Sequence, residues 1–275
     1  MLGRVEHRLV SLVRVVGLPW VAPVEDAGSP MVHDQRVPAT AVLVHGGWHG
    51  AWCFDRVMPL LAAAMVPAVA VDLPGHGADP GPFTDLHGDA DRVRGVLDAI
   101  EGDVVLLGHS YGGAVITEAG DHPAVRHLVY LCALALDEGE SCAAAAVAET
   151  SGLSHQGRPR LADGWVAHPD GTTTLTAEGA AGCLYQDCDP ATVAWAIAQL
   201  GPQPMANLGQ APATVAWRAR PSTYVVCSED QAIHPGLQRV LARRCTATCE
   251  WMTGHSPFAN KPALLSALLA DLTHA

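Results

Sequence analysis

One six-residue stretch constrains the fold of this chain more than any other, because of what flanks it. The stretch is GHSYGG at positions 108–113, which places Ser110 in the pattern G-x-S-x-G. The apolar run Asp103–Leu107 before it is typical of a β-strand, and Ala114–Ala119 after it can continue as a helix. A strand, tight turn and helix around this pattern form a nucleophile elbow, which strains the serine backbone and exposes its hydroxyl above a sheet. The sequence therefore predicts Ser110 as a catalytic nucleophile.

The same alternation of strand and helix continues along most of the chain. Strands are expected at 39–45, 67–72, 103–107, 125–133, 224–227 and 247–252, and helices at 54–65, 85–100, 114–119, 236–243 and 261–272. Strands that are regularly followed by helices predict an α/β fold with a mainly parallel central sheet and helices on both faces.

Two segments depart from this alternation. Residues 1–38 are expected to be a loosely attached extension and linker, with disorder, a true start at Met31 and a surface-binding helix as alternatives. The folded α/β domain is then expected to span residues 39–275. Within it, 137–220 is too long for a plain loop and is expected to be a cap inserted over the carboxyl ends of the strands, where open α/β sheets place their ligands.

Composition narrows the classes of protein. The chain has 275 residues, 16% of them charged, and a net charge of −12, which argues against a nucleic-acid partner. The apolar N-terminal stretch is too short for a membrane span of about 20 residues. Eight cysteines without a C-x-x-C pair, and no secretory signal, favour reduced, mostly buried thiols in a cytoplasmic protein. No metal or cofactor is expected, and nothing specifies an oligomeric state.

A serine nucleophile needs a base and an acid that orients this base. In the predicted fold the chain order is serine, then acid, then histidine. His255 lies directly after the last expected strand, which separates it from the other 13 of the 14 histidines. Asp230 follows the preceding strand and is the favoured acid, with Glu229 and Asp137 as competitors.

An oxyanion that develops on the substrate needs two donors. One is expected to be the backbone N–H of Tyr111, which follows the nucleophile. The other is expected from the glycine-rich loop HGGWHGAW at 45–52, with the Gly47 amide favoured and the Trp48 amide as the alternative. The other histidines near these motifs are interpreted as structural: His45, His49, His76 and His109.

Three aromatic side chains are candidate substrate contacts. Trp48 belongs to the glycine-rich loop, and Trp165 and Tyr185 belong to the expected cap. Ordinary packing of the cap is the alternative for the latter two.

These motifs together resemble the α/β-hydrolase superfamily. They are HGGWHGAW at 45–52, DLPGHG at 72–77, GHSYGG at 108–113, SEDQAI at 228–233 and GHSPF at 254–258, and they run in order from about residue 39 to the C-terminus. Within the superfamily, the chain is similar to the small esterases grouped with plant methylesterases and hydroxynitrile lyases. The resemblance implies an α/β-hydrolase fold, a Ser110–His255–Asp230 triad and an oxyanion hole from the amides of Gly47 and Tyr111.

Two positions separate this chain from the plant lyases of the group. Those lyases carry a threonine next to the oxyanion-loop histidine and a lysine after the catalytic histidine, where this chain has Gly46 and Ser256. The sequence therefore favours a serine hydrolase that cleaves a small-molecule carboxylic ester. A hydroxynitrile-lyase-like enzyme and a non-catalytic small-molecule-binding protein on the same fold are the alternatives.

Overall fold

A six-stranded parallel sheet forms the centre of the computed structural model, which describes residues 38–145 and 161–275. The strand order is β2-β1-β3-β4-β8-β9. The strands are β1 (Thr40–Val44), β2 (Ala68–Val71), β3 (Val104–His109), β4 (Val125–Leu131), β8 (Ser222–Cys227) and β9 (Ala247–Trp251). The parallel sheet predicted from the alternating pattern is confirmed. The expectation for residues 1–38 lies outside the described residues, apart from Pro38.

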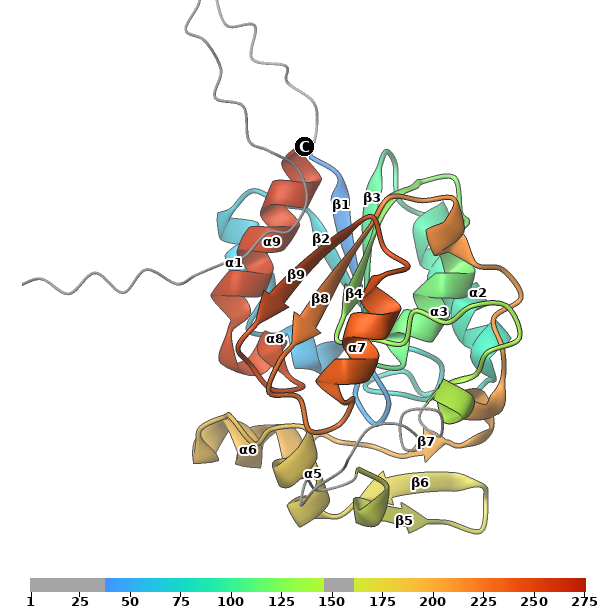
Figure 1. Ribbon diagram of the computed structural model, residues 1–275, viewed down its shortest axis with the longest axis vertical. Helices are drawn as coiled ribbons and strands as arrows, with labels where there is room; N and C mark the ends of the chain where they lie inside the picture. Colours follow the sequence, from blue (N-terminus) through green and yellow to red (C-terminus); the bar gives the residue numbers. More distant parts are fainter. Residues whose placement is uncertain (1–37, 146–160) are drawn as a thin grey trace, which may run out of the picture.

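Helices cover both faces of this sheet (Figure 1). One face carries α1 (Met58–Ala63), α8 (Pro257–Asn260) and α9 (Pro262–His274), and the other carries α2 (Leu86–Asp98), α3 (Gly112–Ala119) and α7 (Pro235–Ala242). Because successive side chains of a strand point to opposite faces of the sheet, each central strand contributes residues to the hydrophobic core on both faces. In β3, Val104 and Leu106 pack with α2 and α3, whereas Val105 and Leu107 pack towards α1 and α9.

The chain between β4 and β8 leaves the sheet and forms a second, smaller layer. Residues 161–220 of this stretch are here named the cap segment, and residues 132–145, which follow β4, are also described. The cap segment contains a three-stranded antiparallel sheet of β5 (Trp165–Ala167), β6 (Thr172–Leu175) and β7 (Gln203–Pro204), with α5 (Ala177–Cys183) and α6 (Pro190–Ile197). This layer lies at the end of the sheet to which the strand arrows point (Figure 1).

The two ends of the described domain meet at the opposite end of the sheet (Figure 1). The N–H of Ala39, just before β1, donates to the carbonyl of Thr273 in α9 at 2.9 Å. The helix α9 also packs on α1 and β1, so the last helix closes the structure against the first strand.

Candidate active site

The turn at Ser110 has the geometry expected of a nucleophile elbow. Ser110 lies between β3 and α3 with φ of 53°, a left-handed conformation that is costly for a residue with a side chain. The turn is tight enough that a Cβ on Gly108 would stand 2.4 Å from the Gly112 carbonyl oxygen. The side chain of Ser110 is partly exposed, while most of its neighbours in the sequence are buried.

The expected base and acid form a buried pair. His255 Nδ1 lies 2.7 Å from Asp230 Oδ2, and the two side chains are 1% and 0% exposed. Other donors hold the same carboxylate: the N–H groups of Ala232 and Ile233 reach Oδ1, and Gln238 Nε2 reaches Oδ2 at 2.7 Å. A carboxylate accepts hydrogen bonds, so Nδ1 of His255 donates and Nε2 is left as the basic nitrogen.

The competing acids lie in different surroundings. Glu229 is exposed to solvent, and Asp137 forms an ion pair with Arg218 at 2.5 Å. The carboxylate that contacts the His255 imidazole is that of Asp230.

The loop that carries His255 is tied to the elbow. The carbonyl of His255 accepts hydrogen bonds from His109 Nε2 at 2.9 Å and from Cys132 Sγ at 3.3 Å. The imidazole rings of His109 and His255 are 4.6 Å apart, and His109 is the residue before Ser110. The fold thus brings the base loop and the serine turn together.

The same three side chains have the residue types of a metal site. One potential ligand atom from each of His109, Cys132 and His255 lies within 4.8 Å of the others, and all three residues are buried. His109 Nε2 and Cys132 Sγ are however engaged by the His255 carbonyl. The arrangement is therefore explained by hydrogen bonding within the protein.

Hydrogen bonds fix the peptide planes of the glycine-rich loop. The Gly46 carbonyl accepts from His45 Nδ1 at 2.8 Å and from the His49 N–H at 3.3 Å. Because a peptide unit is planar and trans, the Gly47 N–H of the same unit points in the opposite direction. The Trp48 N–H donates to Gln203 Oε1 at 3.3 Å. Of the two amides considered, that of Trp48 is engaged, while no acceptor among the described residues engages that of Gly47.

This loop lies against the serine. A Cβ built on Gly46 would stand 2.8 Å from Ser110 Cβ and 2.9 Å from His109 Nδ1. The second expected donor, the amide of Tyr111, lies at the N-terminal end of α3, where N–H groups lack acceptors within the helix. The Tyr111 side chain is buried and its hydroxyl donates to Asp89 at 2.6 Å.

Two histidines of the loop are buried as neutral rings. Burial, followed by the nearby His76, lowers the pKa of His45 to about 3, and burial lowers the pKa of His49 to about 4. His49 Nδ1 therefore donates to the Gly47 carbonyl at 2.7 Å, and its Nε2 accepts from the Tyr185 hydroxyl at 2.7 Å. Hydrogen bonds within the protein engage both rings.

The three candidate substrate contacts have different exposures. Trp48 is 6% exposed, has a φ of 63° and donates its indole N–H to the Thr173 carbonyl at 3.1 Å. Its ring lies 5.9 Å from that of Trp165, which is 37% exposed. Tyr185 is fully buried, and its hydroxyl donates to His49 Nε2. Of the three, Trp165 presents the most surface to a ligand.

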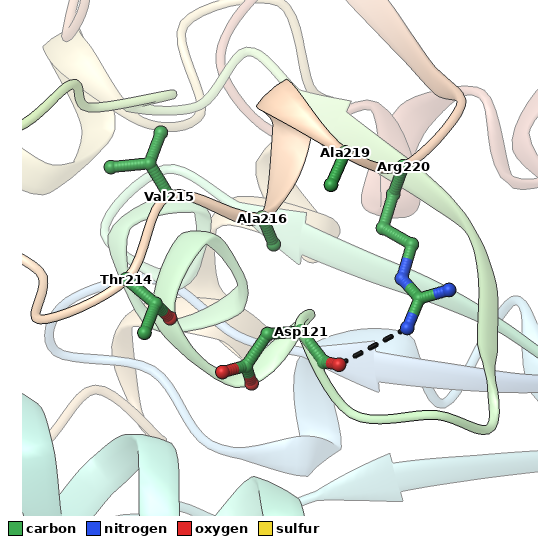
Figure 2. Close-up of a pocket in the computed structure, with 6 residues that line it drawn as sticks. All are labelled: Asp121, Thr214, Val215, Ala216, Ala219 and Arg220. Atoms are coloured by element: carbon green, nitrogen blue, oxygen red, sulfur yellow. Dashed lines mark hydrogen bonds between the residues drawn. The ribbon is translucent and has the colours of Figure 1, made fainter.

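A pocket of about 410 Å³ lies elsewhere, between the end of α3 and the chain that leads to β8. It is lined by Asp121, Thr214, Val215, Ala216, Ala219 and Arg220 (Figure 2). The Arg220 guanidinium donates to the Asp121 carbonyl across it at 3.1 Å. Since α3 begins at the elbow and runs for about 12 Å, this pocket is remote from Ser110.

The fold and the site define an α/β hydrolase. Residues 41–268 match the model of the alpha/beta hydrolase family, and the chain belongs to this family. It is 29% identical over 248 residues to alpha/beta hydrolase nvfD of Aspergillus novofumigatus, a match that covers 84% of this chain and 94% of nvfD. It is 41% identical over 113 residues to the carbendazim hydrolyzing esterase of a Nocardioides species, covering 38% of this chain and 45% of that protein.

Solved structures share the fold, and a sequence relative belongs to the group that the motifs indicated. Polyneuridine aldehyde esterase matches with a TM-score of 0.74 at 22% identity, covering 86% of this chain and 99% of the esterase. A pyrethroid hydrolase from Sphingobium faniae matches with a TM-score of 0.73 at 25% identity, covering 86% and 98%. Methylesterase 9 of Arabidopsis thaliana is 36% identical over 85 residues, 29% of this chain and 33% of that protein. The resemblance to the plant methylesterase group is confirmed.

Two further observations concern the cysteines and the helices. All eight cysteines lie in the described part of the chain and are free thiols. Among residues 38–145 and 161–275, no helix combines the length and apolar character that a membrane crossing requires.

Proposed function

We propose that this protein is a serine hydrolase that cleaves a small-molecule carboxylic ester through an acyl-enzyme intermediate. The observation that carries the proposal is the buried His255–Asp230 pair, held by the His255 carbonyl against the residue that precedes Ser110. Relatives that are named esterases support the same reaction class.

The residues divide the reaction into two steps. His255 Nε2 takes the hydroxyl proton as Ser110 Oγ attacks the ester carbonyl, and the amides of Gly47 and Tyr111 stabilise the resulting oxyanion. The same proton then passes to the leaving alcohol. A water molecule activated by His255 releases the acid, and Ser110 regains its proton. Trp48 and Trp165 are the proposed walls for the substrate.

Two features favour ester hydrolysis over cyanohydrin cleavage. Ser256, which follows the proposed base, is fully buried and carries no charge, whereas the lyases place a lysine there to help cyanide leave. Gly46 stands so close to Ser110 that a threonine would displace the nucleophile. The free thiols are in keeping with our further proposal of a cytoplasmic location.

Removing the nucleophile and the base tests the proposal. Ser110→Ala and His255→Ala should each lower kcat by several orders of magnitude on p-nitrophenyl and methyl esters, and the double variant should lose little more, because the residues act as a unit. A fluorophosphonate probe should label the wild type and not Ser110→Ala. Substantial hydrolysis by Ser110→Ala would exclude the acyl-enzyme mechanism, and cyanide release from mandelonitrile without ester hydrolysis would favour the lyase. Ligand binding with neither reaction would favour the binding protein.

A further inference from the structure

A three-residue turn in the cap segment contacts three of the loops that form the proposed catalytic site. The turn is Tyr185–Asp187, which follows α5, and each of its side chains reaches a different loop. The contacts are Tyr185 Oη to His49 Nε2 at 2.7 Å, Gln186 Nε2 to the Glu229 carbonyl at 2.9 Å, and the Gly254 N–H to Asp187 Oδ2 at 2.5 Å. The turn thus touches the glycine-rich loop, the acid loop and the base loop at once.

Asp187 makes the densest of these contacts. Its Oδ2 accepts the N–H of Gly254, the residue immediately before His255. The same oxygen accepts from Asn260 Nδ2, at the end of α8, and lies 3.1 Å from Thr253 Oγ1. One carboxylate therefore joins residues on both sides of His255. Hydrogen bonds to an ionised acceptor are shorter and stronger than neutral ones, so such a clamp is stiff.

The turn also presses directly on the backbone of the base loop. A Cβ on Gly254 would stand 2.2 Å from Gln186 Nε2 and 2.6 Å from Asp187 Oδ1. Glycine at this position permits the close approach of cap and loop. Asp189, two residues later, lies at the start of α6 and makes no hydrogen bond to the base loop in the described part of the chain. Its carboxylate accepts hydrogen bonds from the N–H and the hydroxyl of Thr192, in the first turn of α6.

We propose that Asp187 is a positioning residue for His255, and that the Tyr185–Asp187 turn makes the cap segment a part of the catalytic framework. The inference rests on the proposed ester hydrolysis for its kinetic consequences. Asp187 holds the main chain of the base loop while Asp230 orients the imidazole. Without Asp187, the base loop can shift relative to Ser110, and a misplacement of about 1 Å costs on the order of 10²-fold in rate.

Three variants test this role by kinetics on p-nitrophenyl esters, with active sites counted by fluorophosphonate titration. Asp187→Ala should lower kcat by between about tenfold and about 100-fold with little change in KM. Asp187→Asn keeps an acceptor for the Gly254 N–H and should recover most of this loss. Asp189→Ala is the matched control: it removes a helix cap in the same segment and should lower thermal stability while kcat stays at the wild-type value.

A second measurement does not depend on turnover. The proton between His255 Nδ1 and Asp230 should give a strongly deshielded NMR signal, because this bond is short and buried. The signal should persist in Asp189→Ala and broaden through exchange with water in Asp187→Ala. If Asp187→Ala does not fold, Asp187→Ser takes its place in both readouts, because its shorter polar side chain does not reach the Gly254 N–H.

The outcomes separate the two proposals. Equal kcat and an equal proton signal in Asp187→Ala, or in Asp187→Ser in its place, and in Asp189→Ala would overturn the positioning role while leaving the hydrolase intact. A wild type that hydrolyses no ester, but whose proton signal is lost in Asp187→Ala and kept in Asp189→Ala, would overturn the hydrolase and retain the positioning role.

Discussion

At the scale of single residues, backbone strain gathers around the proposed catalytic centre. Four described residues other than glycine have positive φ: Trp48, Met65, Ser110 and Cys132. Three of them belong to the site: Ser110 is the elbow, Trp48 lies in the glycine-rich loop, and Cys132 contacts the His255 carbonyl. Such conformations cost of order 1–3 kcal/mol each and persist where the surroundings enforce them. The residues with strained backbone therefore gather at the same site as the hydrogen bonds that hold His255 and Asp230.

The acid can be identified by a pair of neighbouring substitutions. Asp230→Asn should lower kcat on the order of 10⁴-fold. If the amide oxygen stays with the N–H groups of Ala232 and Ile233, its NH₂ faces both Gln238 Nε2 and His255 Nδ1, which favours the wrong tautomer. Steady-state kinetics of Glu229→Gln, at an exposed position, provides the control and should be close to wild type. The reverse order of effects would assign the acid to Glu229.

At the scale of elements, the site depends on how closely the glycine-rich loop, β3 and α3 approach one another. A Cβ on Gly112 would stand 2.5 Å from the His45 carbonyl oxygen, so the start of α3 lies directly on the end of β1. This contact sets the loop amide beside the serine turn. The lack of a side chain at Gly112 thus permits the close approach of the two halves of the proposed oxyanion hole.

Adding one methyl group should disturb this approach. Gly46→Ala places a Cβ 2.8 Å from Ser110 Cβ, and we expect both kcat and the melting temperature to fall as the serine moves. Gly95→Ala in α2 is the matched control, because nothing lies within 4 Å of its Cβ position. It should leave kcat unchanged and stabilise the helix by about 0.5–1 kcal/mol. Wild-type activity in Gly46→Ala would show that the loop can retreat freely.

The elements of the site were largely predictable from the sequence, whereas the small sheet of the cap segment was not. β-type runs such as Val104–Leu107, flanked by glycine turns, mark central strands clearly. The sheet of β5, β6 and β7 has no comparable signal, since β7 is the two residues Gln203–Pro204. The expected last helix at 261–272 corresponds to α9, whereas the short helix α8 before it was not expected.

The supporting contacts were hidden for a different reason. Asp187 and Gln203 belong to no recognisable sequence motif, and their significance comes from partners 67 and 155 positions away. The burial of Tyr185 likewise depends on His49, 136 positions earlier. Local patterns carry no information on such pairings, because these depend on how the cap segment docks on the sheet.

At the scale of the whole molecule, the buried histidines make stability depend on pH. Burial holds the pKa of His45 at about 3, that of His49 at about 4 and that of His109 well below its usual range. These rings stay neutral in the folded protein but take up protons in the unfolded chain below about pH 6.5. Each histidine then lowers the free energy of unfolding by up to about 1.4 kcal/mol per pH unit as pH falls.

Urea unfolding at pH 7, 6 and 5 measures this dependence. The free energy of unfolding should fall over this range, although the raised pKa of Asp89, which is caused by burial, acts in the opposite direction. His274→Gln, at an exposed position, should keep the same slope. A free energy that is constant or rises towards pH 5 would contradict the neutral state of the buried rings.

The bond between Ala39 and Thr273 has a consequence for chain connectivity. The start of the first strand lies beside the end of the last helix, so a short linker could join them. New chain ends could then be opened at the exposed turn of Glu101 and Gly102. In such a circular permutant, the nucleophile would come almost first in the chain and the glycine-rich loop last, yet every contact at the carboxyl edge of the sheet would be preserved. The order in which the catalytic loops are synthesised is thus separable from the geometry that they adopt.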